Sequence, residues 1–384
     1  MTSDSNKVIF WVGGADNNGQ RDATSDAALA KGEAWVTGQA TLIINPGLGS
    51  ACPVPTNTKI ANDPNVGTTT GGGTGGGGGT PGSRDRTLWP FSIDSHWNRP
   101  LGSGATYAGT GDARVQYLSR SVIYVNAGEW SDPVFQAQAG DPVYTLHETE
   151  SNRNRQIRVP GNARPDPTTD PGMSIIDETK TFVTDMYGAN FSGSTITSER
   201  AWKYTLSGEG RRADDATPSM DPAANFCGSA LGGLIRLWEL QGSNKIQHAL
   251  IFSTGDAGLK HTTSFPYPAV QEDYDGSSTY HGTMVAGTMI AIDPTVNLGS
   301  LGLSTNGLKV AKALQDYGAY LSNRSQDFNI TLYAEGAAEG PLVDDIRNTI
   351  DRVRPYLRVV TNASTPGNPT GGGTPRVPPA PALA

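Results

Sequence analysis

His248 is the titratable residue whose setting in the sequence most strongly suggests chemistry. It lies in IQHALIF, residues 246–252, an apolar segment that is typical of a buried strand. Strand alternation places its side chain on the same face as Leu250 and Phe252. A histidine there is either a core residue bonded to a backbone carbonyl, which the apolar neighbours favour, or a cleft residue that acts as a base or binds sugar. Both interpretations stay open.

Arg236 and Tyr267 are the residues that could act together with His248. Arg236 stands in the apolar segment LGGLIRLWEL, where a partly buried guanidinium needs a carboxylate partner or a bound anion. The residue type favours a structural ion pair. In a polysaccharide lyase, however, an arginine neutralises the uronate carboxylate while a histidine or tyrosine removes the neighbouring proton. His248, Arg236 and Tyr267 are therefore the candidate catalytic residues, and no metal site is predicted.

The segment SFPYPAVQEDYDG, residues 264–276, is the candidate ligand-binding loop. Aromatic rings stack on sugar rings, and carboxylates bind sugar hydroxyls or Ca²⁺. One alternative is a solvated loop without a ligand, and another is an acid–base pair of carboxylates for glycoside cleavage, formed by Glu272 and Asp275. The candidate ligand-binding residues are Tyr267, Glu272, Asp273, Tyr274 and Asp275. No cofactor is predicted other than Ca²⁺ at the Glu272–Asp275 loop.

Two patterns that suggest other chemistry are excluded. The string HGTMVAGTM, residues 281–289, resembles the histidine motif of subtilisin-like proteases, but the aspartate and serine contexts of that catalytic triad are missing. Two cysteines, Cys52 and Cys227, and five scattered histidines do not form a zinc site with C-x-x-C spacing. Each cysteine is better interpreted as a lone thiol than as half of a disulfide.

The composition of the 384-residue chain favours turn-rich β structure. It has 48 Gly and 26 Pro, and only 17% of its residues are charged, against about 25% in an average soluble domain. The net charge of −8 argues against a nucleic-acid partner. No apolar run reaches the roughly 18 residues that span a bilayer, so no membrane partner is expected. The first residues lack the pattern of a secretory signal peptide.

A glycine-rich tract divides the chain into modules. Residues 66–84 contain VGTTTGGGTGGGGGTPG, which is typical of a flexible linker because so many glycines lose too much backbone entropy on folding. The linker follows a small N-terminal module, residues 1–65, which is interpreted as an anchor. The head module, residues 85–363, comes next. Residues 364–384 form a Pro/Gly-rich tail that is expected to be extended and solvated.

Short apolar runs separated by turn residues predict a mainly β head module, with antiparallel sheets in a sandwich or jelly-roll arrangement. The predicted strands are residues 121–126, 142–148, 155–160, 174–187 (a hairpin), 201–206, 246–252, 284–293 and 329–335. One amphipathic helix is expected over residues 306–324, with Asn306 as its N-cap, because apolar residues recur there at spacings of three and four.

Three segments of the head module carry a family resemblance. They are PFSIDSHWNRPLG (90–102), LGGLIRLWELQGSNKIQHALIF (231–252) and AKALQDYGAY (311–320). With them, most of residues 88–361 resembles a poorly characterised β-rich family of bacterial and phage virion or tail-associated proteins. The resemblance implies a carbohydrate-related architecture comparable to jelly-roll polysaccharide lyases. The positions that recur in the family are Trp97, Asn98, Arg236, Glu239, His248, Tyr317 and Tyr333.

These observations predict a phage virion-surface structural protein of the head-fibre, decoration or tail-fibre type. Residues 1–65 would contact capsid or tail subunits, and the head module, present in many copies or as a homo-oligomer on the virion, would bind host-surface polysaccharide. Many relatives have H-S-D-G where this chain has QEDYDG, and this difference favours binding over catalysis. The alternatives are a polysaccharide-degrading lyase or hydrolase, and a purely structural capsid or tail component without a ligand.

Overall fold

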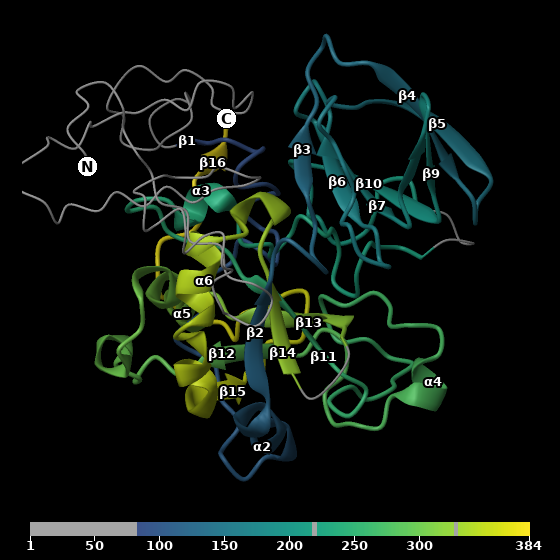
Figure 1. Cartoon of the computed structure of the whole chain (residues 1–384). Helices are drawn as coiled ribbons and strands as arrows, with labels where there is room; N and C mark the ends of the chain where they lie inside the picture. Colours follow the sequence, from purple (N-terminus) through teal and green to yellow (C-terminus); the bar gives the residue numbers. More distant parts are fainter. Residues whose placement is uncertain (1–82, 217–220, 326–328) are drawn as a thin grey trace, which may run out of the picture. The chain divides into compact units, whose positions relative to one another are not determined.

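A mixed six-stranded sheet forms the centre of the part of the chain that this computed structural model describes, residues 83–216, 221–325 and 329–384 (Figure 1). Across the sheet the strands are β15 (Leu357–Val359), β12 (Met289–Ile292), β13 (Ala319–Arg324), β11 (Leu250–Thr254), β14 (Asn329–Tyr333) and β2 (Val122–Asn126). The pairs β11·β13 and β14·β2 are parallel, and the other pairs are antiparallel.

Helices cover the apolar face of this sheet. They are α2 (Ala113–Arg120), α5 (Thr305–Asp316), α6 (Pro341–Arg347) and the 3₁₀ segment η3 (Ile350–Tyr356). Helix α5 packs on β12 and α2 packs on β15, so that Leu250, Leu332, Val310 and Ile346 share one core. Burial of these aliphatic side chains is the main stabilising contribution, at roughly 25 cal/mol per Å² of apolar surface.

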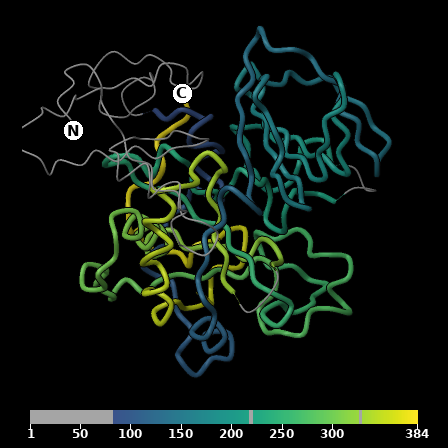
Figure 2. The backbone as a smooth tube through the Cα atoms, in the orientation of Figure 1, coloured from purple at the N-terminus to yellow at the C-terminus, as the bar shows by residue number. Residues whose placement is uncertain are grey.

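The chain between β2 and β11 contains a separate β-sandwich, which Figure 2 shows as a continuous teal stretch of the backbone. One sheet consists of β10 (Arg200–Thr205), β7 (Phe182–Tyr187), β6 (Met173–Ile176) and β3 (Val134–Gln136), and the other of β5 (Arg153–Arg158), β4 (Val143–Glu148), β9 (Thr195–Ser198) and β8 (Asn190–Ser192). Their facing sides bury a second core that includes Leu146, Met173, Met186 and Ile196.

The mainly β, sandwich-like fold class that the sequence predicted is confirmed. The prediction of antiparallel pairing holds for the hairpin of β6 and β7 but not throughout, because β3·β6 and β4·β9 are also parallel. Parallel pairs join strands that are distant in the sequence, and alternation within a single strand does not reveal the direction of its partner.

The helix predicted for residues 306–324 ends earlier than expected. Helix α5 stops at Asp316, its N-cap is Ser304 instead of Asn306, and residues 319–324 form the central strand β13. Gly318, with φ 79°, makes the turn between them, and a side chain there would meet the Ile290 carbonyl oxygen. Apolar residues continue beyond Gly318 because β13 is buried on both faces, and for this reason the sequence pattern resembled a longer helix.

The C-terminal segment is not an extended, solvated tail. Strand β16 (Ala382–Leu383) pairs in parallel with β1 (Ser83–Arg84), and Arg376 donates to the Gln315 carbonyl at 2.6 Å. Ala380 is buried, and the Gly371–Gly373 backbone lies against residues 102–105. This Pro- and Gly-rich segment therefore packs closely against the rest of the described chain.

Residues 1–82 lie outside the described part of the chain, and with them the predicted anchor (1–65), Cys52 and most of the linker (66–84). Cys227, which is described, is buried and carries a free thiol. None of the helices in the described ranges is long and apolar enough to cross a membrane.

Candidate functional site

Arg236 and His248, two of the candidate catalytic residues, belong to one buried ion-pair network. The Arg236 Nε lies 2.6 Å from Glu335 Oε2, and the His248 Nε2 lies 3.1 Å from Glu239 Oε1. The backbone N–H of Arg236 donates to Glu239 Oε2 at 2.8 Å, which joins the two pairs. The short helix α3 (Leu237–Leu240) holds Glu239 in place directly after Arg236.

The hydrogen-bond partners of His248 favour a protonated ring. Its Nδ1 lies 2.9 Å from the Ala249 carbonyl oxygen, and its Nε2 faces the Glu239 carboxylate. Both neighbours are acceptors, so both ring nitrogens must carry protons for both contacts to be hydrogen bonds. Burial alone would lower the pKa of His248, but the charge of Glu239 and these two hydrogen bonds outweigh it and raise the pKa. Both hydrogen-bond acceptors and the raised pKa thus favour the protonated ring.

The space beside this network is a narrow pocket. It is lined by residues 88–91, Trp97, Asn98, residues 231–234, Arg236 and His248. Arg236 and His248 are only 8% and 6% exposed, and Trp97 and Asn98 are fully buried. The remaining room suits little more than a water molecule. Four of the seven positions named from the family resemblance, Trp97, Asn98, Arg236 and His248, line this closed pocket, whereas Tyr317 and Tyr333 do not.

Tyr267, the third candidate catalytic residue, lies in a different set of contacts. Its hydroxyl donates to Glu209 Oε1 at 2.6 Å, and its ring packs under the Arg211 guanidinium. Burial and the nearby Glu209 raise the pKa of the Tyr267 hydroxyl. Within the described part of the chain, no hydrogen bond or ring contact joins it to His248 or Arg236. The three candidates are therefore not assembled into one catalytic group.

The acidic loop is organised around an arginine that the sequence analysis did not single out. Arg324, at the end of β13, lies 3.0 Å from Asp275 and 3.5 Å from Asp256, and also faces Asp273. Asp273 accepts a hydrogen bond from the Tyr280 hydroxyl, and burial raises its pKa. Arg324 was assigned to the end of a helix, so its partners on the loop could not be predicted.

The candidate ligand-binding residues of this loop point in different directions. Glu272 pairs with His261 and accepts the Thr262 N–H, whereas Asp275 faces Arg324, so the two do not form an acid–base pair. Tyr274, between Asp273 and Asp275, is 96% exposed and is the most exposed large aromatic side chain of the described residues. The loop thus offers one free ring flanked by two fixed carboxylates.

A second acidic group escaped the sequence analysis altogether. Burial and the nearby charges of Asp185 and Asp166 raise the pKa of Asp132 to about 8. Burial also raises the pKa of Asp185 to about 6, although the hydroxyls of Ser229 and Ser174 donate to its carboxylate. These residues are far apart in the sequence, and no local motif identifies them. Asp132 is the carboxyl group here that is most readily protonated at neutral pH.

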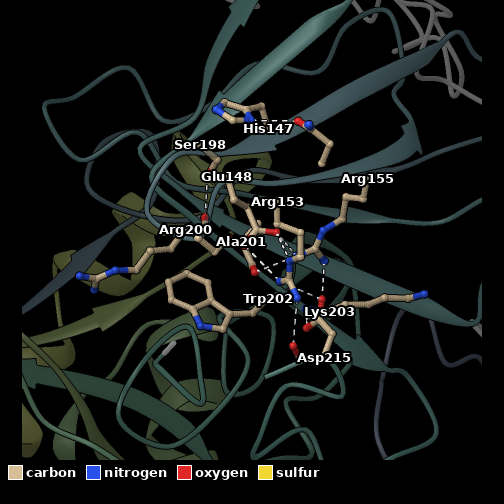
Figure 3. A network of polar contacts seen from close by, with 12 residues as sticks. His147, Glu148, Arg153, Arg155, Ser198, Arg200, Ala201, Trp202, Lys203 and Asp215 are labelled. Atoms are coloured by element: carbon tan, nitrogen blue, oxygen red, sulfur yellow. Dashed lines mark hydrogen bonds and ion pairs between the residues drawn. The ribbon is translucent and has the colours of Figure 1, made fainter. Parts of the chain in front are cut away.

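The arginine pair Arg153 and Arg155 forms the most connected polar network of the sandwich (Figure 3). Both guanidiniums contact the buried Glu148 carboxylate and Asp215, and Arg155 also donates to the Ala201 carbonyl of β10. Two cations and two anions balance one another here, and the contacts join the two sheets. The network therefore holds the two sheets of the sandwich together.

No family model, curated protein or solved structure matches the chain. The contacts described above are therefore the basis for proposing a function. In the described residues, no group of three or more His, Cys, Asp or Glu side chains is placed to hold a metal ion. Ca²⁺ at the Glu272–Asp275 loop stays a prediction.

Proposed function

We propose that residues 83–384 are the carbohydrate-binding head of a phage virion-surface protein of head-fibre, decoration or tail-fibre type. The observation that carries the proposal is the exposed Tyr274 ring between Asp273 and Asp275. A sugar ring can stack on the tyrosine while the flanking carboxylates accept hydrogen bonds from its hydroxyls. The family resemblance and the glycine-rich sequence of residues 66–82 support the placement on a particle.

The surroundings of His248 and Arg236 favour glycan binding over polysaccharide cleavage. A general base needs a free lone pair, whereas both ring nitrogens of His248 face hydrogen-bond acceptors, the Ala249 carbonyl and the Glu239 carboxylate. An arginine that neutralises a substrate carboxylate must be accessible, but the Arg236 guanidinium is buried against Glu335. A lyase or hydrolase that uses these two residues would first have to open the network.

Replacing Tyr274 by alanine is expected to weaken glycan binding by about tenfold without changing stability, because an exposed ring contributes stacking but little core packing. The measurement is binding of the full chain to an array of bacterial surface and neutral glycans, with thermal unfolding of both proteins in parallel. The control is Tyr187→Ala, which removes an exposed tyrosine from the sandwich. A wild-type chain that binds no glycan on the array would contradict the proposed function.

A fusion of residues 1–65 to a fluorescent protein is expected to be incorporated into phage particles, and residues 83–384 are expected to be dispensable for incorporation. The physical reason is that a 65-residue module buries too little apolar surface alone and gains it against a capsid or tail subunit. The measurement is fluorescence of particles purified from infected cells. Incorporation of the fusion that carries residues 83–384 instead would make the head the attachment point.

A further inference from the structure

The peptide bond between Asp132 and Pro133 lies in the connection from β2 to β3, which leads from the six-stranded sheet to the sandwich (Figure 1). An Asp–Pro bond hydrolyses more readily than other peptide bonds for two reasons. The proline nitrogen belongs to a tertiary amide, and the aspartate carboxyl can reach the carbonyl carbon of its own residue. The surroundings of the aspartate therefore decide whether such a bond is stable.

The carboxyl of Asp132 differs from those of the other Asp–Pro pairs because it has no partner. Within residues 83–216, 221–325 and 329–384, no hydrogen bond or ion pair reaches it, and only nearby charges and burial act on it. In each of the five other Asp–Pro pairs of these ranges, the carboxylate accepts a hydrogen bond or forms an ion pair. Those aspartates are Asp141, Asp166, Asp170, Asp221 and Asp293. Donors keep these five carboxylates ionised and fixed in place.

The groups that face Asp132 favour its neutral, protonated form. Burial, Asp185 of β7 and Asp166 together raise the pKa of Asp132 to about 8. Tyr333 of β14 also lies near it, and burial raises the pKa of this tyrosine to about 12, so that it stays uncharged. Arg347, which contacts the end of β2, pairs with Glu339 instead. At neutral pH the Asp132 side chain is therefore mainly a carboxylic acid.

The carbonyl group of Asp132 is held by a backbone donor. The Gly336 N–H donates to this oxygen at 3.3 Å, and such a donor stabilises the negative charge that develops when the carbonyl carbon is attacked. On the other side of the bond, the Ser174 N–H donates to the Pro133 carbonyl at 2.9 Å. Residues 131–133 are partly exposed, so water can reach the products. The bond thus has a neutral acid, an oxyanion donor and access to solvent.

We propose that the chain cleaves its own Asp132–Pro133 bond. A carboxyl oxygen of Asp132 bonds to the Asp132 carbonyl carbon, and the carboxyl proton passes to the Pro133 nitrogen. The C–N bond breaks, which frees Pro133 as a new amino terminus and leaves a cyclic anhydride on Asp132. Water then opens the anhydride and leaves Asp132 with two free carboxyl groups. The net reaction is the hydrolysis of one peptide bond, with water as the only other reactant.

The cut breaks one of the two connections between the six-stranded sheet and the sandwich. Strand β2 stays paired with β14, helix α2 stays packed on β15, and β3 stays paired with β6. The cleaved protein is therefore expected to stay assembled under native conditions and to separate into fragments 1–132 and 133–384 in denaturant. This processing is independent of glycan binding.

The test is incubation of the purified full chain at pH 7 with protease inhibitors, followed by denaturing gel electrophoresis and intact-mass spectrometry. Fragments 1–132 and 133–384 are expected to accumulate. Asp132→Asn, which lacks the acidic proton, is expected to cleave at least about tenfold more slowly. The matched control is Asp293→Asn, at an Asp–Pro bond whose carboxylate accepts the Thr295 N–H, and it is expected to leave the cleavage at 132–133 unchanged. Circular dichroism and thermal unfolding establish that the variants are folded.

Two further measurements distinguish self-cleavage from a contaminating protease. The rate is expected to fall as the pH rises through about 8, because the reactive carboxyl is the protonated one. Pro133→Ala keeps the carboxyl but makes the leaving nitrogen a secondary amide, so it is expected to slow the cut, whereas a protease cleaves this variant at least as fast. Absence of the two fragments in wild type, equal cleavage of Asp132→Asn, or a rate already lost above about pH 4 overturns the proposal.

Discussion

Glu148→Gln is expected to lower the free energy of unfolding by about 3 kcal/mol, because it removes the buried carboxylate that both partly buried arginines share. Glu148 is fully buried, and Arg153 and Arg155 both contact its carboxylate. Asp215 alone would then face two guanidiniums. The same contacts reach the Ala201 carbonyl of β10, so the loss affects both sheets of the sandwich (Figure 3).

The measurement is urea unfolding followed by circular dichroism, and the matched control is Glu150→Gln. Glu150 lies two residues further along, and its ion pair with Arg200 is largely exposed. Exposed pairs typically contribute about 1 kcal/mol or less, so this change is expected to cost little. Equal costs for the two variants would show that the Glu148 network does not stabilise the sandwich.

The fold class follows from the sequence because apolar alternation and turn residues are local signals. The strands β2, β4, β7, β10 and β14 lie close to where alternation predicts them. The signal fails where an element is buried on both sides. Residues 319–324 combine helical spacing with a central strand, and Gly287, with φ 83°, shortens the strand predicted for 284–293 to β12. Only tertiary contacts distinguish these alternatives.

The residues of the candidate site could be predicted from the sequence, but their partners could not. The apolar context of Arg236 correctly indicated a buried cation that needs a carboxylate, but its partner, Glu335, is 99 residues away in the sequence. Likewise, the sequence identified the acidic loop around Tyr274 but not Arg324, which organises it. Partners that are distant in the sequence meet only through the sheet order, and a single sequence carries no signal for that order.

The stability that His248 contributes is expected to fall as the pH rises. The pKa of His248 is raised in the folded chain, so the folded state holds the proton more tightly than the unfolded one. The stabilisation is complete below the unfolded pKa of about 6.5 and is lost as the pH rises through the folded pKa. Above that pH one ring nitrogen presents a lone pair to the Ala249 carbonyl or the Glu239 carboxylate, and repulsion replaces a hydrogen bond. Each pKa unit between the two states corresponds to about 1.4 kcal/mol.

The proton itself can be followed by nitrogen-15 NMR of the histidine rings, in which His248 is expected to keep both protons at neutral pH. His248→Gln removes the titration, so the stability difference between wild type and this variant should shrink as the pH rises above the unfolded pKa of about 6.5 and through the raised folded pKa. The control variant is His281→Gln, which replaces an exposed histidine. Other groups also titrate, notably Asp132 with its pKa of about 8, and the comparison cancels them because both proteins contain them. A neutral His248 ring at pH 7 would show instead that burial outweighs the Glu239 charge, and the closed pocket would then contain a histidine with a free lone pair.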